Sequence, residues 1–354
     1  MRKNYFILLA AVTVASQTLA SAATSTSASS LPQGMVVLSA AAGSTTYLSL
    51  PLSNNAVYTG IVGSVAASTI TVSGTSVFSS NFATVGAPYF VKMLTGLEKG
   101  RMLLITANTS TVLTVSTTDD SSQTVGLLTS GFSVAAGDTF EIVPGDTITA
   151  IFGANTKASP LTLTGATSYA SADWVNIYSP STTSWQVYFF DTALGYWTLE
   201  GSTVNANNTV LYPDDGLSIT RHSTSEPAAS LILTGRVAEV PVMTKTVGSN
   251  AIMYGSTGYP IGMKLSQLNF GANWVKGTTT ATADVVSVWN AATKTFSSYY
   301  QMPDSTWRLS GDTTDDMSST VLPAGGCIAI QQHLVVSGSS SYLPSAMPYT
   351  LANF

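Results

Sequence analysis

An internal repeat in the second half of the chain constrains the fold more than any other feature. Matching segments recur in the same order, at an offset of 110 or 111 positions. Five pairs match: residues 173–178 with 284–289, 184–190 with 295–301, 197–201 with 307–311, 209–216 with 319–326, and 219–222 with 330–333. A period of this length is too long for one unit of a solenoid, so the repeat predicts two tandem small domains of the same fold.

The segments between turns have the composition of β-strands. Short runs rich in Val, Ile, Thr, Tyr and Phe alternate with Gly, Ser, Asn and Asp. Only 9% of the residues are charged and 45% are hydrophobic, which excludes intrinsic disorder. One short helix is expected over residues 146–152, capped by Asp146 and ended by Gly153. The sequence therefore predicts an all-β fold with very little helix, in which an N-terminal β domain precedes two tandem duplicated modules, each a β-sandwich or barrel.

Composition also suggests the domain boundaries. All six Trp residues lie beyond residue 150. We expect an N-terminal β domain over 35–150, a first copy of the module over 151–240 and a second over 241–354. Within the first domain, residues 88–106 are expected to form a hairpin around the loop 96–100, whose flanking glycines allow positive φ.

The N-terminus has the pattern of a secretory signal peptide. Two basic residues, an apolar stretch and a small-residue cleavage site follow one another over residues 1–22. A Ser/Thr/Ala-rich linker over 23–34 comes next. We therefore expect export to the periplasm, the outer surface or the medium, with no integral membrane segment after cleavage. Cys327 is the only cysteine and lies in a predicted strand, so we expect it to be a small buried hydrophobe.

The residues needed for common catalytic chemistry are not found together. There is no Gly-x-Ser-x-Gly motif, and His222 and His333 occupy equivalent ends of the two copies. Asp173 and Asp284 are also equivalent, so each is expected to do one local task, such as ordering the entry to a strand. We therefore predict that the protein is not an enzyme and has no catalytic residues. A secreted hydrolase with an unrecognised site is kept as a further alternative function.

No cofactor or metal site is predicted from spacing. The two His residues and single Cys have no metal-binding spacing, and no phosphate-binding loop is found. Calcium stays an open alternative at the acidic loop of Asp312, Asp315 and Asp316. The simpler interpretation is that these side chains bind their own backbone as turn residues do.

Aromatic side chains are the remaining candidate site. Large aromatic residues recur at matched positions of both copies, which favours packing in two cores over exposed platforms for sugars. Trp174, Tyr178 and Trp289 lie on the opposite face of their strands from the predicted core, by the two-residue alternation of a strand. We predict that these three residues are exposed and contact a partner or a glycan.

The repeated features also resemble a known group of sequences. An Asp opens a strand, a Trp-x-Leu follows, and a Pro-x-x-Gly turn leads into an apolar strand that ends near His. With residues 89–91, Gly96, Gly100 and residues 105–108, this pattern resembles an uncharacterised family of exported Ser/Thr-rich β proteins known mainly from verrucomicrobial genomes. The resemblance covers nearly all of the expected mature chain. It implies export and β architecture, and it brings no activity or catalytic residues.

These features predict an interaction protein. A formal net charge of −5 without a basic cluster excludes a nucleic-acid-binding protein that works by neutralising phosphates. We expect a non-enzymatic structural or interaction protein of the cell envelope or surface, which self-associates or binds an extracellular polysaccharide through its β modules. The alternative is a carbohydrate-binding or adhesive protein.

Overall fold

The computed structural model describes most of the chain beyond its N-terminal segment. It covers residues 31–354 except for 75–77, 118–126, 130–131, 180–181, 183, 225–226, 247–251, 271–273, 334–339, 345–346 and 351–354. The expected signal peptide (1–22) and most of the expected linker (23–34) lie outside the described residues. Within the described part, no helix is long and apolar enough to cross a membrane. Pro32–Phe354 forms one compact unit.

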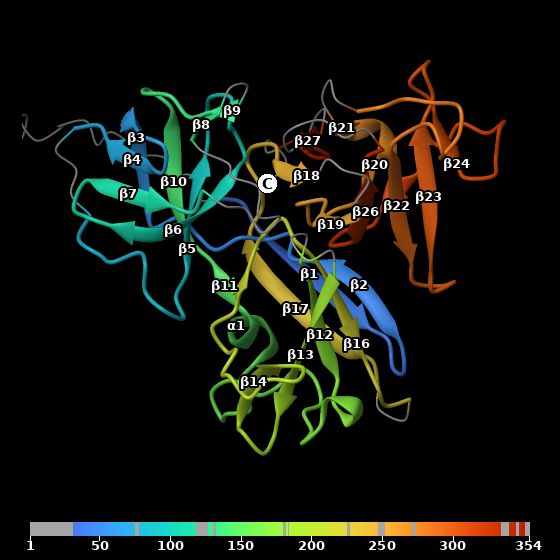
Figure 1. Ribbon diagram of the computed structural model, residues 1–354, viewed down its shortest axis with the longest axis horizontal. Coiled ribbons are helices and arrows are strands. Elements are labelled where there is room, and N and C mark those ends of the chain that lie inside the picture. The colour runs from blue at the N-terminus through green and yellow to red at the C-terminus, as the bar shows by residue number, and fades with distance from the viewer. Residues whose placement is uncertain are drawn as a thin grey trace, which may run out of the picture. The chain divides into compact units, whose positions relative to one another are not determined.

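Almost all regular structure in this unit is β-strand, which confirms the predicted fold class (Figure 1). Six antiparallel strands close into a barrel in the order β10-β3-β4-β7-β6-β5. Their bounds are β3 (Tyr58–Val65), β4 (Thr69–Val72), β5 (Tyr89–Met93), β6 (Met102–Asn108), β7 (Val112–Val115) and β10 (Thr139–Pro144), and a small hairpin joins β8 (Leu128–Thr129) to β9 (Phe132–Ser133). The hairpin of β5 and β6 confirms the prediction, with φ of 81° at Gly96 and 93° at Gly100.

The first copy of the repeat, which we call module 1 (residues 33–53 and 146–238), has a five-stranded sheet in the order β14-β13-β12-β16-β2. A two-stranded ribbon, β1–β17, and a short pair, β11–β15, complete it. The bounds are β1 (Gln33–Ala40), β2 (Thr45–Ser49), β11 (Asp146–Thr147), α1 (Ile148–Phe152), η1 (Tyr169–Ser171), β12 (Trp174–Ser179), β13 (Ser184–Asp191), β14 (Tyr196–Leu199), β15 (Val210–Leu211), β16 (Gly216–Thr220) and β17 (Ala229–Arg236).

The second copy, module 2 (residues 244–350), repeats this arrangement. Its five-stranded sheet has the order β24-β23-β22-β26-β19, its short pair is β20–β25, and β18 pairs with β27 as β1 does with β17. The bounds are β18 (Thr244–Thr246), β19 (Ile252–Ser256), β20 (Met263–Lys264), η2 (Leu265–Gln267), β21 (Leu268–Asn269), β22 (Val285–Asn290), β23 (Thr295–Gln301), β24 (Trp307–Leu309), β25 (Val321–Leu322), β26 (Cys327–Gln331) and β27 (Ser340–Pro344). The same strand order in both copies confirms the predicted duplication.

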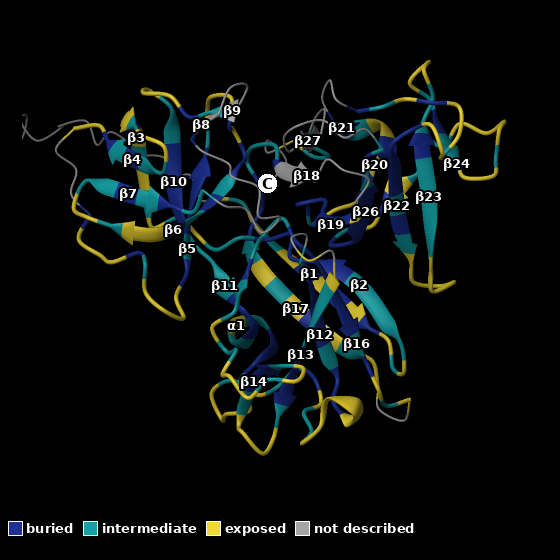
Figure 2. Cartoon of the chain, in the orientation of Figure 1, coloured by how far each residue is buried: buried dark blue, intermediate teal, exposed yellow. Residues whose placement is uncertain are grey.

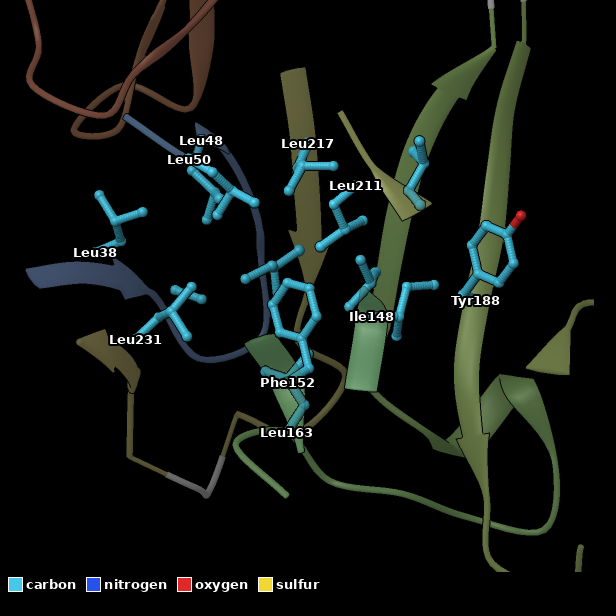
Figure 3. Packing of buried hydrophobic residues seen from close by; sticks show 14 of the residues in the cluster. Leu38, Leu48, Leu50, Ile148, Phe152, Leu163, Tyr188, Leu211, Leu217 and Leu231 are labelled. Atoms are coloured by element: carbon cyan, nitrogen blue, oxygen red, sulfur yellow. The ribbon is translucent and has the colours of Figure 1, made fainter. Parts of the chain in front are cut away.

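The strand pairing revises the expected boundary of the N-terminal domain. Residues 33–49, most of which we assigned to a first domain over 35–150, pair instead with β16 and β17 of module 1. Leu38 and Leu48 belong to the same hydrophobic core as Phe152 and Leu217 (Figure 3). The barrel is therefore an insertion between β2 and β11 of module 1. Its two ends meet where Asn54 Nδ2 donates to the carbonyl of Pro144 at 3.1 Å.

Two local expectations are refined. The short helix is present as α1, but its N-cap is Thr147, whose hydroxyl accepts from the backbone N–H of Ala150, while Asp146 belongs to β11. Gly153 ends the helix with φ of 87°, as predicted. The fourth repeated segment also aligns one residue further along, because β15 and β16 match β25 and β26 at an offset of 111.

Buried charges join the barrel to module 1. Arg236 of β17 contacts Glu141 of β10 at 2.5 Å and Glu239 at 2.8 Å, and Lys92 of β5 lies 3.4 Å from Glu141. Burial lowers the pKa of the Lys92 ammonium, and the carboxylate of Glu141 opposes this effect. Breaking these contacts would leave an uncompensated buried charge, so the cluster stabilises the contact between β10, β5 and β17.

Candidate functional site

The two equivalent aspartates hold the entry to the same strand in each module. Asp173 accepts hydrogen bonds from the backbone N–H of Thr164 at 2.9 Å and of His222 at 3.0 Å. Asp284 accepts from the N–H of Val275 at 2.9 Å and of His333 at 2.7 Å. Both carboxylates are buried. The predicted local task of these residues is therefore confirmed.

The partners of the two carboxylates differ in charge. Arg221 Nε lies 2.6 Å from Asp173, and both side chains are buried. The residue 111 positions later is Gln332, whose side chain hydrogen-bonds to Asp284. Burial raises the pKa of Asp284, although its hydrogen bonds act in the opposite direction. Module 2 therefore keeps a buried carboxyl with a neutral partner where module 1 has an ion pair.

The two histidines mark the strand ends that these carboxylates bind. Each aspartate accepts a hydrogen bond from the backbone N–H of its histidine through Oδ1. The His222 ring packs against Trp174 at a centroid distance of 4.3 Å.

The acidic loop of module 2 binds its own backbone. Asp312 accepts from the N–H groups of Thr314 and Asp315, and Asp316 accepts from the N–H of Ser318 at 2.9 Å. The backbone N–H groups of Thr314 and Asp315 lower the pKa of Asp312, and the hydroxyl of Ser318, followed by its N–H, lowers the pKa of Asp316. Among the residues that the structure describes, no group of three or more His, Cys, Asp or Glu side chains is placed to hold a metal ion.

The faces of the two sheets that we expected to meet a partner meet each other. Tyr47 of β2 and Tyr254 of β19 stack with their ring centroids 6.0 Å apart and 17° between their planes. They are equivalent residues, because they pair with Ser218 and Ala329, which are themselves matched by the repeat. Tyr47 also contacts Trp289 at 4.7 Å, and Tyr254 contacts Tyr178 at 4.9 Å. The contacts are reciprocal, which is the pattern of a twofold-symmetric dimer.

Main-chain contacts repeat the same symmetry. The N–H of Ser49 in module 1 donates to the carbonyl of Gly325 in module 2 at 2.8 Å, and the N–H of Ser256 in module 2 donates to the carbonyl of Asp214 in module 1 at 2.9 Å. Cys327 is fully buried, as predicted. A Cβ on its counterpart Gly216 would collide with the Cys327 sulfur. The two modules are therefore an internal pseudo-dimer, closely packed at this point.

Two grooves flank the contact between the modules. The larger has a volume of about 560 Å³ and the smaller about 250 Å³. Every residue that lines the smaller groove has its counterpart, at the offset of the repeat, in the lining of the larger one. Examples are Ile177 and Val288, Tyr178 and Trp289, Tyr188 and Tyr299, Thr209 and Thr320, and Tyr212 and Pro323. The grooves are thus two copies of one surface feature.

Two strands of module 1 contribute to the wall of the larger groove. Residues 37–39 of β1 and 46–48 of β2 line it, together with β22, β23 and the turn before β26. No residue in its lining is charged, whereas the smaller groove includes Asp215. Burial raises the pKa of Tyr47, so its phenol stays neutral at physiological pH. The larger groove therefore offers aromatic rings, hydroxyls and the amide of Asn290 without charge.

The three residues predicted to contact a partner or a glycan lie in different environments. Trp289 lines the larger groove and is half-buried, while Tyr178 lines the smaller one and is buried, so its expected exposure is wrong. Tyr178 is covered because Tyr254 and Trp185 pack on it. Trp174 lies in neither lining and packs on Tyr169 and His222.

Sequence reasoning did not identify Tyr47 and Tyr254 as candidates. A signal is present, since Tyr-x-Ser occurs at 47–49 and again at 254–256. The sequence Phe-Gly-Ala-Asn also occurs twice, at 152–155 and 270–273. Both pairs fall outside the constant offset, because the barrel and shorter insertions separate them from the rest of module 1.

Comparisons with known proteins give no match, whether to family models, to curated proteins or to solved structures.

Proposed function

We propose that this chain is an exported, non-enzymatic binding protein that holds an uncharged polysaccharide in the larger groove between its modules. The observation that carries the proposal is the repeated groove, which two copies of the module build from matching residues. Export is supported by the N-terminal segment, which has the order of a signal peptide. The protein would therefore act on polymers outside the cytoplasm.

The chemistry of the larger groove fits a neutral sugar chain. Sugar rings present apolar faces that stack on aromatic side chains, and Trp289, Tyr47 and Tyr299 lie in the lining. Sugar hydroxyls exchange hydrogen bonds with neutral groups such as Thr46, Ser297 and Asn290. A charged polymer would lose its hydration without gaining an ion pair, because the lining carries no charge. The groove therefore favours uncharged over charged polysaccharides.

Binding to immobilised polysaccharides tests this proposal. The mature protein is expected to bind at least one uncharged polysaccharide, such as a glucan, mannan or xylan, more tightly than alginate or heparin. Trp289→Ala should weaken binding about tenfold, which corresponds to about 1.4 kcal/mol. Trp174→Ala is the matched control, because this Trp is also half-buried but lies outside both grooves, and its binding should stay close to wild type.

Two results would overturn the proposal. One is a folded wild-type protein that binds none of the uncharged polysaccharides. The other is binding that Trp289→Ala leaves unchanged, since the ligand would then lie elsewhere on the surface.

A further inference from the structure

The β1–β17 ribbon presents an uncharged, partly apolar face to solvent. Side chains alternate along both strands, and Figure 2 shows exposed residues along them. Val37 is 56% exposed and lies directly opposite Ile232, which is 63% exposed. Met35, at 67%, lies opposite Thr234. Three large apolar side chains on one short ribbon are an exposed patch of the kind that marks a contact site.

No strand other than β1 pairs with β17 among the residues that the structure describes. The last residue of the strand, Arg236, exchanges both backbone hydrogen bonds with Ser53 on the side away from β1. Because backbone groups point to alternate sides of a strand, those of Ser230, Ile232 and Thr234 face the same side. Among the described residues, no backbone partner is found for these three on that side. The edge therefore offers free donors and acceptors over five residues.

In module 2 a short strand pairs with the edge that corresponds to the outer edge of β17. Its equivalent strand, β27, pairs with β18 on one side and with the short strand β21 on the other. In module 1 the corresponding segment is the helix α1, so β17 has no counterpart of β21. Within the part of the chain that the structure describes, no strand pairs with β17 at the edge where β21 pairs with β27.

The features that normally prevent pairing at an edge are also lacking. Exposed edges are usually protected by Lys, Pro, a bulge or a very short strand. The pairing of β1 with β17 runs without a register shift over eight residue pairs, and residues 229–235 include no charge and no Pro. An exposed edge of this kind is a template for pairing with another chain.

We propose that two copies of the chain associate through β17, pairing antiparallel about a twofold axis at Ile232. This segment is complementary to itself. With Ile232 opposite its own copy, Ser230 lies opposite Thr234 of the second copy, and the reverse pair forms on the other side of the axis. Hydroxyl pairs and β-branched pairs of this kind stabilise antiparallel strands. The two ribbons form a four-stranded sheet, across which Val37, Ile232 and their copies form one apolar row.

A second copy also suits the charge of this surface. The chain carries a net charge of −5, which opposes association in general. The exposed positions of the ribbon are Gln33, Met35, Val37, Ser39, Ser230, Ile232 and Thr234, none of which is charged. The twofold axis therefore passes through a neutral part of the molecule.

Sedimentation equilibrium of the mature protein tests this inference. The wild type is expected to be a dimer whose fraction rises with concentration, and Ile232→Lys should raise the dissociation constant by at least about tenfold, because two like charges then lie opposite each other. Ile61→Lys is the matched control, since Ile61 is an exposed Ile of a barrel strand, 50% exposed, and this variant should dimerise as the wild type does. Trp fluorescence checks that both variants fold.

Amide hydrogen exchange locates the contact. The N–H groups of Ile232 and Thr234 should exchange slowly at high concentration and faster on dilution. A wild type that stays monomeric at the highest soluble concentration overturns the inference, and so does an Ile232→Lys variant that dimerises unchanged. Ile232 is not in the lining of either groove, whereas Val37 lines the larger one. Polysaccharide binding is therefore measured on the Ile232→Lys variant as well as on the wild type, so that loss of dimerisation and loss of binding are told apart.

Discussion

Replacing Asp173 by Asn is expected to destabilise the protein more than replacing Asp284 by Asn, although the two residues occupy equivalent positions. Both are buried and each accepts two backbone hydrogen bonds. The difference lies in their partners, which are the buried Arg221 in module 1 and the neutral Gln332 in module 2. The comparison measures how far the two copies have diverged in their electrostatics.

The expected magnitudes follow from these partners. Asp173→Asn leaves the buried guanidinium of Arg221 without its carboxylate, and breaking a buried ion pair in this way costs about 3–5 kcal/mol. Asp284→Asn leaves no charge behind. It turns one acceptor into an N–H₂ group that faces a backbone N–H, a loss of about 1–3 kcal/mol. Arg221→Gln recreates the neutral partner of module 2 in module 1 and should cost less than Asp173→Asn.

The pH dependence has a definite sign. The pKa of Asp284 is raised in the folded protein, so the folded state binds this proton more tightly than the unfolded state. The stability from this group is fully present below the ordinary value of 3.8 and is lost as pH rises through the raised value. The destabilisation caused by Asp284→Asn should therefore shrink as pH rises from about 4.

Urea unfolding combined with hydrogen exchange measures these effects. A protein with several cores need not unfold in one step, so exchange in β12 and β16 reports on module 1, and exchange in β22 and β26 reports on module 2. Equal costs for Asp173→Asn and Asp284→Asn would refute the reasoning. So would a cost for Asp284→Asn that grows as pH rises above 4.

Three further predictions concern how the parts are joined. Gly216→Ala should lower the free energy of unfolding in urea by about 1–3 kcal/mol, because the new Cβ clashes with the Cys327 sulfur. Adding Cys327→Ala to this variant should recover part of the lost stability. If the costs of the two substitutions simply add, the close packing of the modules is contradicted. Replacing residues 55–143 by a short Gly/Ser bridge should leave both modules folded, because Asn54 and Pro144 are in contact. All six Trp residues remain in this variant, so Trp fluorescence reports on folding. An emission spectrum typical of solvent-exposed Trp would contradict the interpretation of the barrel as an insertion. Arg236→Met should cost about 3–5 kcal/mol in urea unfolding, because Glu141 loses its closest cation, and an unchanged stability would contradict that role.

The features that the sequence predicted correctly depend on residues close together in the chain or on the constant offset of the repeat. The two-residue alternation placed Tyr178 and Trp289 on one face of equivalent strands, and both line equivalent grooves. The repeat identified Asp173 and Asp284 as residues with one task per module. These inferences depend on neighbours within a strand or on a constant offset, and neither requires knowledge of distant contacts.

The features that the sequence did not predict depend on pairing between segments far apart in the chain. β2 belongs to module 1 across the whole inserted barrel, so Tyr47 and Tyr254 are separated by much more than the constant offset of the repeat. A search at a constant offset therefore assigned β1 and β2 to the wrong domain. The same break hid the aromatic contact between the modules, and Tyr178 was expected on an exposed face although Tyr254 covers it.

Photo-crosslinking from the two stacked tyrosines tests most directly whether the modules form an internal pseudo-dimer. A benzophenone amino acid replaces Tyr47 in one variant and Tyr254 in the other, and mass spectrometry locates the crosslinks in monomeric chains. Crosslinks from position 47 should map to Trp289 and Phe296, and those from position 254 to Tyr178 and Trp185. Crosslinks that stay within the module of origin in both variants would contradict the paired modules and the two equivalent grooves.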